Sequence, residues 1–194
     1  MLTTSGNATT ATQEFIEASR VFLKDDFLPK AKLCLEEMSE QDLWRRPNEQ
    51  SNSVGNLVLH LCGNMKQWIV KSLGGSKFER DRDAEFAERG PVAKAQLIAD
   101  IHDTVMEVDR TLCALPTSEM LERFPVQGYS TSRLQAIYHV VEHFSLHLGQ
   151  IVLVAKMHAP GAVQFYEDAG GLARPIWPEL SDRSHSPQGT PSGP

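Results

Sequence analysis

The chain has 194 residues, of which 41% are hydrophobic and 23% are charged, and its formal net charge is −6. This length suits one domain with a sizeable core, and the acidic balance argues against a nucleic-acid-binding protein that relies on a basic face. No apolar run approaches the ~18 residues that a transmembrane helix needs, and the first residues lack the basic start and apolar core of a signal peptide.

The three cysteines, Cys34, Cys62 and Cys113, show no short repeated spacing. An odd number of cysteines without such spacing is not a disulfide framework, and each of them lies in an apolar helical context where a thiol packs as a small hydrophobic group. We therefore expect a protein of a reducing, cytoplasmic compartment.

Residues 1–12 are rich in Thr, Ser and Ala and are predicted to form a disordered leader before a domain that spans residues 13–180. A helical pattern runs from Gln13 to Met38. Pro29 lies inside it, and because proline removes a backbone donor, we expect this first helix to be bent or split there.

A polar connection, residues 39–52, follows, with Trp44 and Pro47 as its expected anchors. Ser53 is a candidate N-cap for a second helix from Val54 to about Leu73, and two glycines then end it.

Residues 76–90 are charged and aperiodic, so we interpret them as a loop. Pro91 is well placed as the first residue of a third helix. Its apolar residues recur at intervals of three and four up to Leu115, and Pro116 stops the pattern.

Residues 117–130 form a further connection, and Ser130 or Thr131 can cap a fourth helix that runs to about His158. The segment Phe165–Pro178 is apolar enough to pack back on the domain. Residues 181–194 are rich in Ser, Pro and Gly and are predicted to be a disordered tail. No stretch shows a convincing strand pattern.

Four long helical segments without strands predict an all-α protein with the architecture of a four-helix bundle. The predicted connections are longer than the ~2–8 residues that usually join the helices of a bundle. Such lengths favour a bundle with a crossover connection over a plain up-and-down arrangement.

The fourth predicted helix carries three histidines, His139, His143 and His147, each four residues from the next. Four residues advance a helix by about 400°, so these side chains stack on one face. Two imidazoles one turn apart can hold a single divalent metal, as in the helical zinc motif with two histidines at i and i+4.

His60 lies beside the apolar stripe of the second predicted helix and can point inward between helices, where bundles assemble metal sites. Together with His143 and His147 it would supply three imidazoles and no fourth protein ligand, which is the composition of an open site. The alternative is that these three histidines are polar core residues that happen to converge.

Other side chains near the histidines have less certain roles at this stage. We interpret His139 as a neighbour of the site and not as a ligand, and Glu142 as a minor candidate. Cys62 is a poor fourth ligand because two residues correspond to about 200° around a helix. Asn64 and Gln150 either orient site groups or are ordinary polar residues.

The remaining histidines are not expected to take part in the site. His102 flanks the apolar stripe of the third helix and is interpreted as a boundary residue. His158 and His185 lie at or beyond the end of the fourth helix, where we expect them to be solvated.

Two segments that contain the histidines, NSVGNLVLHLCGN at residues 52–64 and HVVEHFSLHLGQ at residues 139–150, resemble the DinB/YfiT-like superfamily of metal-dependent enzymes. The resemblance is closest to its DUF1572 branch. It extends over about Gln13–Pro178 and includes RDRDAEF at residues 80–86 and WRRPN at residues 44–48.

This resemblance implies a four-helix bundle of up-down-down-up topology that is often dimeric. It implies a divalent metal, zinc, nickel or iron, held at positions that correspond to His60, His143 and His147. Characterised relatives include transferases and isomerases that use a low-molecular-weight thiol, bacillithiol or mycothiol, as a cofactor.

The leading hypothesis is a cytoplasmic, homodimeric metalloenzyme that acts on a small molecule, without nucleic acid or membrane as a partner. It would be either a hydrolase or a thiol-dependent S-transferase, because a metal can activate a water or a thiol. A hydrolase would need a base, for which Glu142 or His139 is the nearest candidate in sequence. The alternative is a non-catalytic stress-response or binding protein with a structural metal or none.

Overall fold

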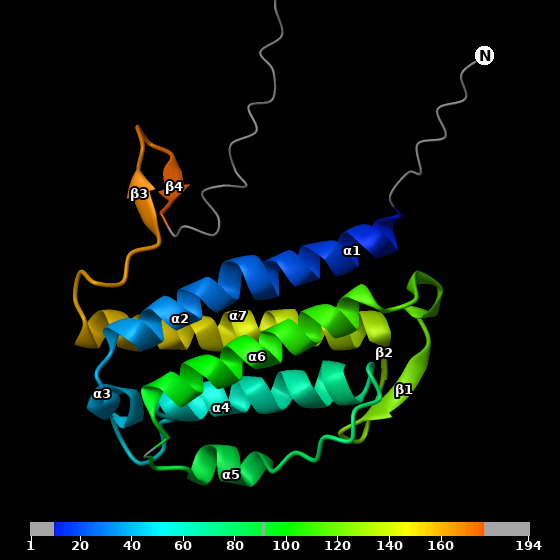
Figure 1. Cartoon of the computed structure of the whole chain (residues 1–194), viewed down its shortest axis with the longest axis horizontal. Coiled ribbons are helices and arrows are strands. Elements are labelled where there is room, and N and C mark those ends of the chain that lie inside the picture. The colour runs from blue at the N-terminus through cyan, green and yellow to red at the C-terminus, as the bar shows by residue number, and fades with distance from the viewer. Residues whose placement is uncertain (1–9, 91, 177–194) are drawn as a thin grey trace, which may run out of the picture.

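The structure, a computed structural model, describes residues 10–90 and 92–176. The predicted tail at 181–194, His185, and most of the predicted leader lie outside the described residues. The described chain is mostly helical, with two small hairpins (Figure 1). None of the helices in this part of the chain has the length and apolar content needed to cross a bilayer.

The first helical segment consists of α1 (Ala11–Arg20), the π-helical turn η1 (Val21–Phe27) and α2 (Leu28–Glu37). Thr10 caps α1 in a capping box with Gln13, so the helix begins two residues before the predicted start. Pro29 does not split the segment. It lies in the first turn of α2, where the wider π-helical bonding leads into the new helix through a bond from the Leu28 N–H to the Leu23 carbonyl.

The second segment confirms the prediction closely, with α4 at Val54–Met65 and the π-helical η2 at Lys66–Lys71. Ser53 caps it in a capping box with Asn56. Before it lies the short helix α3 (Glu40–Trp44). Trp44 is the expected anchor, because its indole Nε1–H donates to the Val92 carbonyl at 3.1 Å and its ring packs against Gly55.

The predicted loop at residues 76–90 is wrong in its central part, where the short helix α5 (Arg82–Ala87) forms. Asp81 caps this helix by accepting the Ala84 N–H. The Asn56 side chain of α4 donates to the carbonyls of Glu85 and Glu88, both at 2.9 Å, and so holds α5 beside α4. Six residues are too few for a periodic pattern, and this anchoring contact is not local in sequence.

The third helix, α6, spans Lys94–Cys113 and ends before Pro116 as predicted. Ala93 is its N-cap, so it starts after Pro91, which lies outside the described residues. A short 3-10 turn, η3 (Thr117–Glu119), follows. The buried side of α6 repeats the predicted three-four spacing and contains Leu97, Ile101, Thr104, Val105, Val108, Asp109 and Leu112.

The prediction that the chain has no strands is wrong, because two antiparallel hairpins form. Strand β1 (Arg123–Val126) pairs with β2 (Tyr129–Ser132), and β3 (Tyr166–Asp168) pairs with β4 (Ala173–Pro175). Gln127 and Gly128 form the turn of the first hairpin with φ values of 50° and 81°, as a tight two-residue turn requires. Strands of three or four residues are too short to show a period of two.

The fourth long helix, α7, spans Arg133–His158, and its end agrees with the prediction. Its cap is Ser132, the last residue of β2, in a capping box with Gln135, and not Ser130 or Thr131, which lie earlier in the strand. The buried residues of α7 recur at intervals of three and four and are Ala136, Ile137, Val140, Phe144, Leu148, Ile151 and Ala155.

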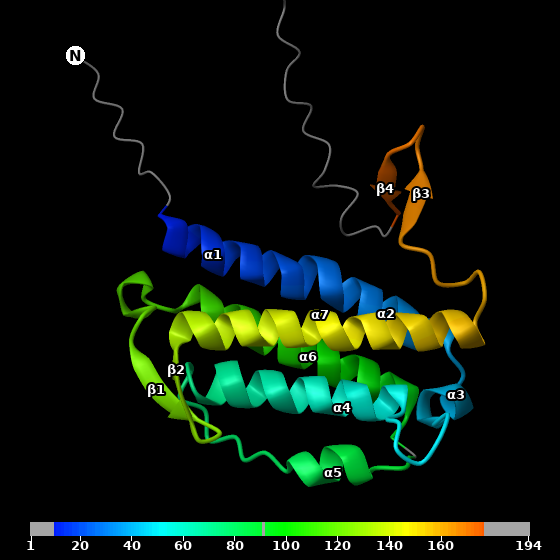
Figure 2. The ribbon, with the colours of Figure 1, turned by 180° about the vertical axis from the view of Figure 1, so that it is seen from behind.

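The long helices share one core. Helix α4 packs against α6 and α7, and α2 packs against the same two helices (Figures 1 and 2). The start of the C-terminal segment packs back on the helices, where Val163 and Phe165 are buried and Lys30 of α2 donates to the Tyr166 hydroxyl at 3.3 Å. The β3–β4 hairpin extends away from the helices with Tyr166 and Leu172 exposed (Figure 1). Trp177 and Pro178 lie outside the described residues.

Candidate metal centre

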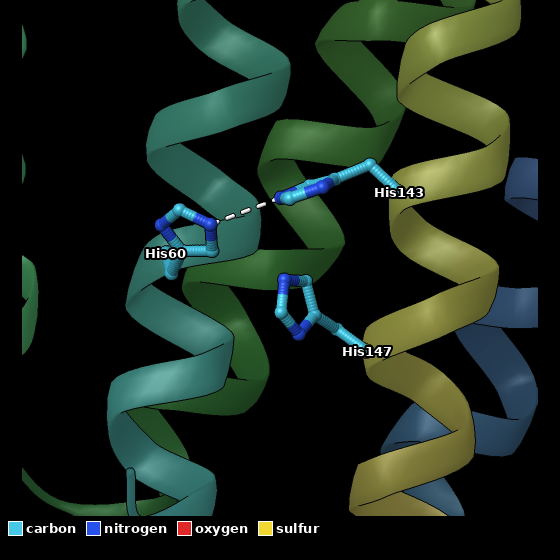
Figure 3. A group of neighbouring side chains, drawn as sticks. All are labelled: His60, His143 and His147. Atoms are coloured by element: carbon cyan, nitrogen blue, oxygen red, sulfur yellow. Dashed lines mark hydrogen bonds between the residues drawn. The ribbon is translucent and has the colours of Figure 1, made fainter. Parts of the chain in front are cut away.

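The three predicted histidines come together between α4 and α7 (Figure 3). Each of His60, His143 and His147 offers one ring nitrogen, and these atoms all lie within 4.8 Å of one another. They are therefore close enough to hold one metal ion. His60 is buried, and the two histidines of α7 are half-buried.

Local sequence explains why these side chains meet. Helix α4 is buried along almost its whole length, so a polar residue at position 60 is enclosed as well. His143 and His147 stand one turn apart beside the core residues Phe144 and Leu148 of α7. Because α4 packs directly against α7, the imidazole of His60 meets the other two across this contact.

Two ring nitrogens of the cluster make a direct contact. The Nε2 atoms of His60 and His143 lie 2.9 Å apart. Two bare nitrogen lone pairs would repel at this distance. Either one nitrogen donates a proton to the other, or a cation is shared between them. A metal site would have a cation at this contact, whereas a simple polar pair would have a proton there.

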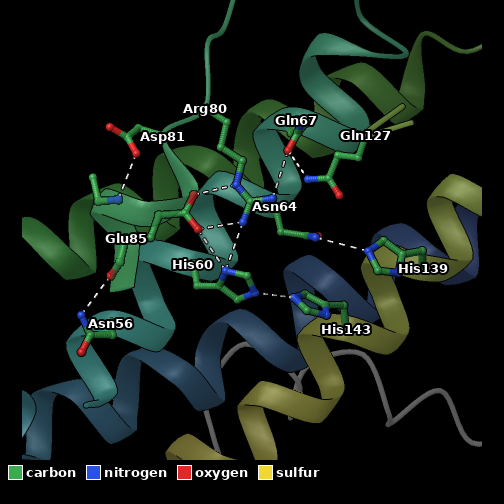
Figure 4. A network of polar contacts seen from close by, with 11 residues as sticks. Asn56, His60, Asn64, Gln67, Arg80, Asp81, Glu85, Gln127, His139 and His143 are labelled. Carbon is green, nitrogen blue, oxygen red and sulfur yellow. Dashed lines mark hydrogen bonds and ion pairs between the residues drawn. The ribbon is translucent and has the colours of Figure 1, made fainter. Parts of the chain in front are cut away.

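The other nitrogen of His60 faces a carboxylate that the sequence-based prediction missed. Nδ1 of His60 lies 3.0 Å from Oε2 of Glu85, which belongs to α5 (Figure 4). Arg80 donates to both oxygens of this carboxylate, from Nε at 2.6 Å and from Nη2 at 2.7 Å. All three side chains are almost completely buried.

The guanidinium and the carboxylate compete for Nδ1 of His60, because Nη2 of Arg80 also lies 3.1 Å from it. Arg80 already donates this group to Glu85, and an ionised carboxylate is the stronger hydrogen-bond partner. We therefore assign the proton of His60 to Nδ1, where it is donated to Glu85. This tautomer leaves the lone pair on Nε2, which faces the cluster.

Gly63 makes room for the carboxylate. A Cβ atom at this position would lie 1.8 Å from Oε1 of Glu85. No side chain larger than hydrogen fits there while Glu85 keeps its place. Together with the anchoring of α5 by Asn56, this close approach fixes the carboxylate beside His60.

A second hydrogen bond orients His147. Its Nδ1 lies 2.8 Å from Oε1 of Gln150, one turn later on α7. The amide oxygen can only accept, so Nδ1 carries the proton and Nε2 of His147 keeps its lone pair. The expectation that Gln150 could orient a site group is confirmed. Asn64 instead donates to Nε2 of His139 at 3.2 Å, so it contacts a neighbour of the cluster.

Burial favours the neutral form of His139, His143 and His147 on α7. Burial, with smaller contributions from the nearby His147, His60 and His139, lowers the pKa of His143 to about 3. The pKa values of His139 and His147 are lowered as well, mainly by burial. A neutral imidazole has a free lone pair and is the form that binds a metal.

The charge of Glu85 is maintained despite its burial. Burial alone would raise the pKa of this carboxyl, but the hydrogen bonds from Arg80 and His60 and the positive charge of Arg80 outweigh it, so its pKa lies below the ordinary value. A buried, ionised carboxylate behind a histidine is the usual support for a metal-binding imidazole. The donor set therefore fits a divalent metal.

Other candidate residues lie outside the cluster. His139 is a neighbour of the cluster, and its ring packs at a tilt against Trp68, with ring centres 4.3 Å apart. Burial raises the pKa of Cys62 to about 12, so its thiol is protonated, and Cys62 is not among the side chains grouped closely enough to hold one metal ion. His102 is exposed and pairs with Asp103. His158, expected to be solvated, pairs with Asp42 at 3.1 Å.

A cavity of about 370 Å³ opens beside the cluster. Its wall includes two of the three histidines, His60 and His143, so a small molecule in the cavity can reach the cluster. The remaining lining residues are Asn64, Trp68, Arg80, Arg82, Gln127, Tyr129 and His139. A larger cavity of about 800 Å³ lies next to α3 and contains none of the three histidines.

The β1–β2 hairpin forms part of the cavity wall through Gln127 and Tyr129. The Gln127 side chain donates to Gln67 of η2, which also accepts a hydrogen bond from Arg80 at 3.0 Å (Figure 4). The hairpin is thereby linked to the same arginine that supports Glu85. The sequence-based interpretation missed this wall together with the hairpin.

None of the curated proteins matches the chain. The model of one protein family, DUF1572, which is described as a protein of unknown function, matches residues 11–165. This match includes all four long helices, both elements that carry the three histidines, and Arg80 and Glu85. The chain therefore belongs to the DUF1572 family.

Proposed function

We propose that the protein is a metal-dependent enzyme in which His60, His143 and His147 hold one divalent metal ion beside a small substrate cavity. The observation that carries this proposal is the convergence of three imidazoles, each of which offers a nitrogen within 4.8 Å of the others. Three histidines without a fourth protein ligand are typical of catalytic and not of structural sites.

A divalent metal in this position would supply Lewis acidity, lowering the pKa of a water or thiol bound to it or polarising a substrate carbonyl. The residues of the chain supply the rest. Glu85 holds the His60 ring in the tautomer with a free Nε2, and Gln150 does the same for His147. The cavity beside His60 and His143 would admit the substrate.

Two reaction classes fit this arrangement, hydrolysis and thiol-dependent S-transfer. Of the two bases suggested by the sequence, His139 lines the cavity and Glu142 does not. Asn64 donates to Nε2 of His139, so the ring proton of His139 is on Nδ1. This N–H can act as a hydrogen-bond donor. His139 can therefore donate a hydrogen bond from Nδ1 to a substrate oxygen. To act as a base, it would first have to give up the hydrogen bond from Asn64 at Nε2.

The proposal also includes the topology of the helices, the oligomeric state and the compartment. We expect the long helices to form a DinB-like four-helix bundle of up-down-down-up topology within residues 13–180. We expect the protein to be a cytoplasmic homodimer that acts on a small molecule. The mutual packing of α2, α4, α6 and α7 and the membership in DUF1572 support the bundle. Zinc, nickel and iron remain the candidate metals.

One observation favours a second function, a non-catalytic binding or stress-response protein. The 2.9 Å contact between His60 and His143 also suits a hydrogen-bonded pair of core imidazoles that needs no metal. Under this alternative, added metal would leave the stability of the domain unchanged.

The two functions differ in their response to metal and thiol. For the enzyme, chelation should remove the metal while the helical circular dichroism signal persists, because the core of the long helices is independent of the site. Product analysis with and without a low-molecular-weight thiol then separates the two reactions. Turnover that does not depend on thiol would exclude the S-transferase, and helices that melt on chelation would indicate a structural metal.

A further inference from the structure

The wall of the cavity beside the histidines carries positively charged side chains, although the protein as a whole is acidic. The chain carries a net charge of −6, yet the lining residues include Arg80 and Arg82 and contain neither Asp nor Glu. The two arginines differ in their surroundings. Glu85 compensates Arg80 through two hydrogen bonds, so Arg80 adds little net charge to the cavity.

Arg82 has no ion pair within residues 10–90 and 92–176, and its side chain is exposed at the cavity. Asp81 and Asp83 flank it in sequence, but neither lines the cavity, and Asp81 accepts the Ala84 N–H as the cap of α5. An arginine with free N–H groups in a partly enclosed wall is a binding group for a carboxylate.

The position of this guanidinium is set by an aromatic ring. The guanidinium carbon of Arg82 lies 4.9 Å from the centre of the Phe86 ring, and Phe86 lies 4.6 Å from the ring of His60. Phe86 therefore contacts both the guanidinium and the ring of His60, the proposed metal ligand. A molecule that bridges the guanidinium and the histidines therefore needs only a few bonds between its charged end and its reacting group.

Aromatic rings form another part of the wall. Trp68 packs against His139 with the two rings tilted, and Tyr129 of the β1–β2 hairpin lines the same space. Such rings favour a flat, apolar body. The cavity volume of about 370 Å³ is near the lower end of the ~300–1,000 Å³ that is usual for small-molecule sites.

We infer that the substrate of this site is a small acid, whose carboxylate is bound by Arg82 and whose flat body lies against the aromatic wall of Trp68, His139 and Tyr129 with its reacting group toward His60 and His143. This inference rests on the proposed function, because it names the class of molecule that would react at the metal. In this inference, Arg82 binds the carboxylate of the substrate and is not a metal ligand.

Benzoate and benzamide are suitable probes, because they share a flat shape and differ in charge. Each is titrated by ligand-observed NMR into the full-length protein, in metal-free and in metal-loaded form, at low ionic strength. The variants are Arg82→Gln and Arg45→Gln, the latter an exposed arginine that lines the different cavity next to α3. Circular dichroism checks that each variant is folded.

We expect the parent protein and Arg45→Gln to bind benzoate about tenfold more tightly than benzamide, the size of one charge-assisted contact. In Arg82→Gln the preference should fall to about one, in both metal-free and metal-loaded protein. An unchanged preference in Arg82→Gln would overturn the inference. A preference that survives in this variant only when metal is loaded would also overturn it, since the metal would then bind the carboxylate.

Elemental analysis of the same samples separates this inference from the proposed function. If the loaded protein retains metal but binds both probes equally, the acid substrate is wrong while the metal site stands. If no metal is retained but the preference depends on Arg82, the anion-binding role of Arg82 holds and the metal-dependent reaction fails.

Discussion

The carboxylate of Glu85 lies 3.0 Å from Nδ1 of His60, while Nε2 of the same ring faces His143 at 2.9 Å. The imidazole is therefore held from one side by an ionised carboxylate and presents its lone pair on the other. The short helix α5 delivers this carboxylate, with Arg80 holding both of its oxygens.

Replacing Glu85 by Gln should weaken metal binding by about 10–100-fold, because the amide removes the negative charge that raises the basicity of His60. Gln can still accept one hydrogen bond from Arg80, so the variant should fold, with a lower melting temperature. The matched control is Asp83→Asn, which removes an exposed charge from the same helix. Competition with a chelator of known affinity measures the effect, and equal affinities in the two variants would contradict the role of Glu85.

Gly63 and Gly149 should respond in opposite directions to replacement by Ala. At Gly63 the new methyl group would overlap Glu85, so we expect a loss of roughly 1–3 kcal/mol in the free energy of unfolding and weaker metal binding. At Gly149, within α7, no atom outside the adjacent residues and the helix backbone lies within 4 Å of the added carbon, and a gain of about 0.4–1 kcal/mol is expected. Urea unfolding measures both. A Gly63→Ala variant with unchanged stability would show that Glu85 can move freely.

The stability of the metal-free protein should fall as the medium becomes acidic. The pKa of His143 is about 3 in the folded protein and about 6.5 when exposed, so the unfolded chain binds more protons between these values. The free energy of unfolding should therefore have its full value above pH 6.5 and decrease as the pH falls toward 3.

Urea unfolding at a series of pH values tests this dependence. In His143→Gln the decrease between pH 6.5 and pH 4 should be smaller, because one buried titrating group is gone. His102→Gln removes an exposed imidazole and should leave the slope unchanged. Parallel slopes in the parent and in His143→Gln would refute the assignment of a buried, neutral imidazole.

The three cysteines should differ sharply in their reaction with iodoacetamide. Burial raises the pKa values of Cys34 and Cys62 to about 12, and both are enclosed, whereas Cys113 is exposed near the end of α6. Mass spectrometry of the native protein should find label on Cys113 alone, and on all three after unfolding. Labelling of Cys62 at the rate of Cys113 would mean that α4 opens readily around the site.

The histidine cluster could be predicted from the sequence because its pattern is local. The stripe on α7 and the four-residue spacing of His143 and His147 both follow from the helical period, and His60 sits on the inner side of a helix with a clear cap at Ser53. The same local signals set the long helices to within a few residues.

Glu85 and Arg80 could not be found in this way. Their importance comes from contacts with His60 and Gln67, which lie more than a dozen residues away in sequence. Only the contact between Arg80 and Glu85 themselves is local. Helix α5 and the strands β1 and β2 are too short for a periodic signal, and they form because Asn56 and the Gln127–Gly128 turn hold them in place. The only early indication was the resemblance of residues 80–86 to a family segment.

The most direct test of the account is elemental analysis of untagged protein purified without chelator, together with His143→Ala and His102→Ala. We predict about one divalent metal ion per chain in the parent and in His102→Ala, and a several-fold lower content in His143→Ala, since two imidazoles alone bind weakly. A parent protein without metal even after reconstitution, or equal metal contents in both variants, would contradict the site formed by His60, His143 and His147.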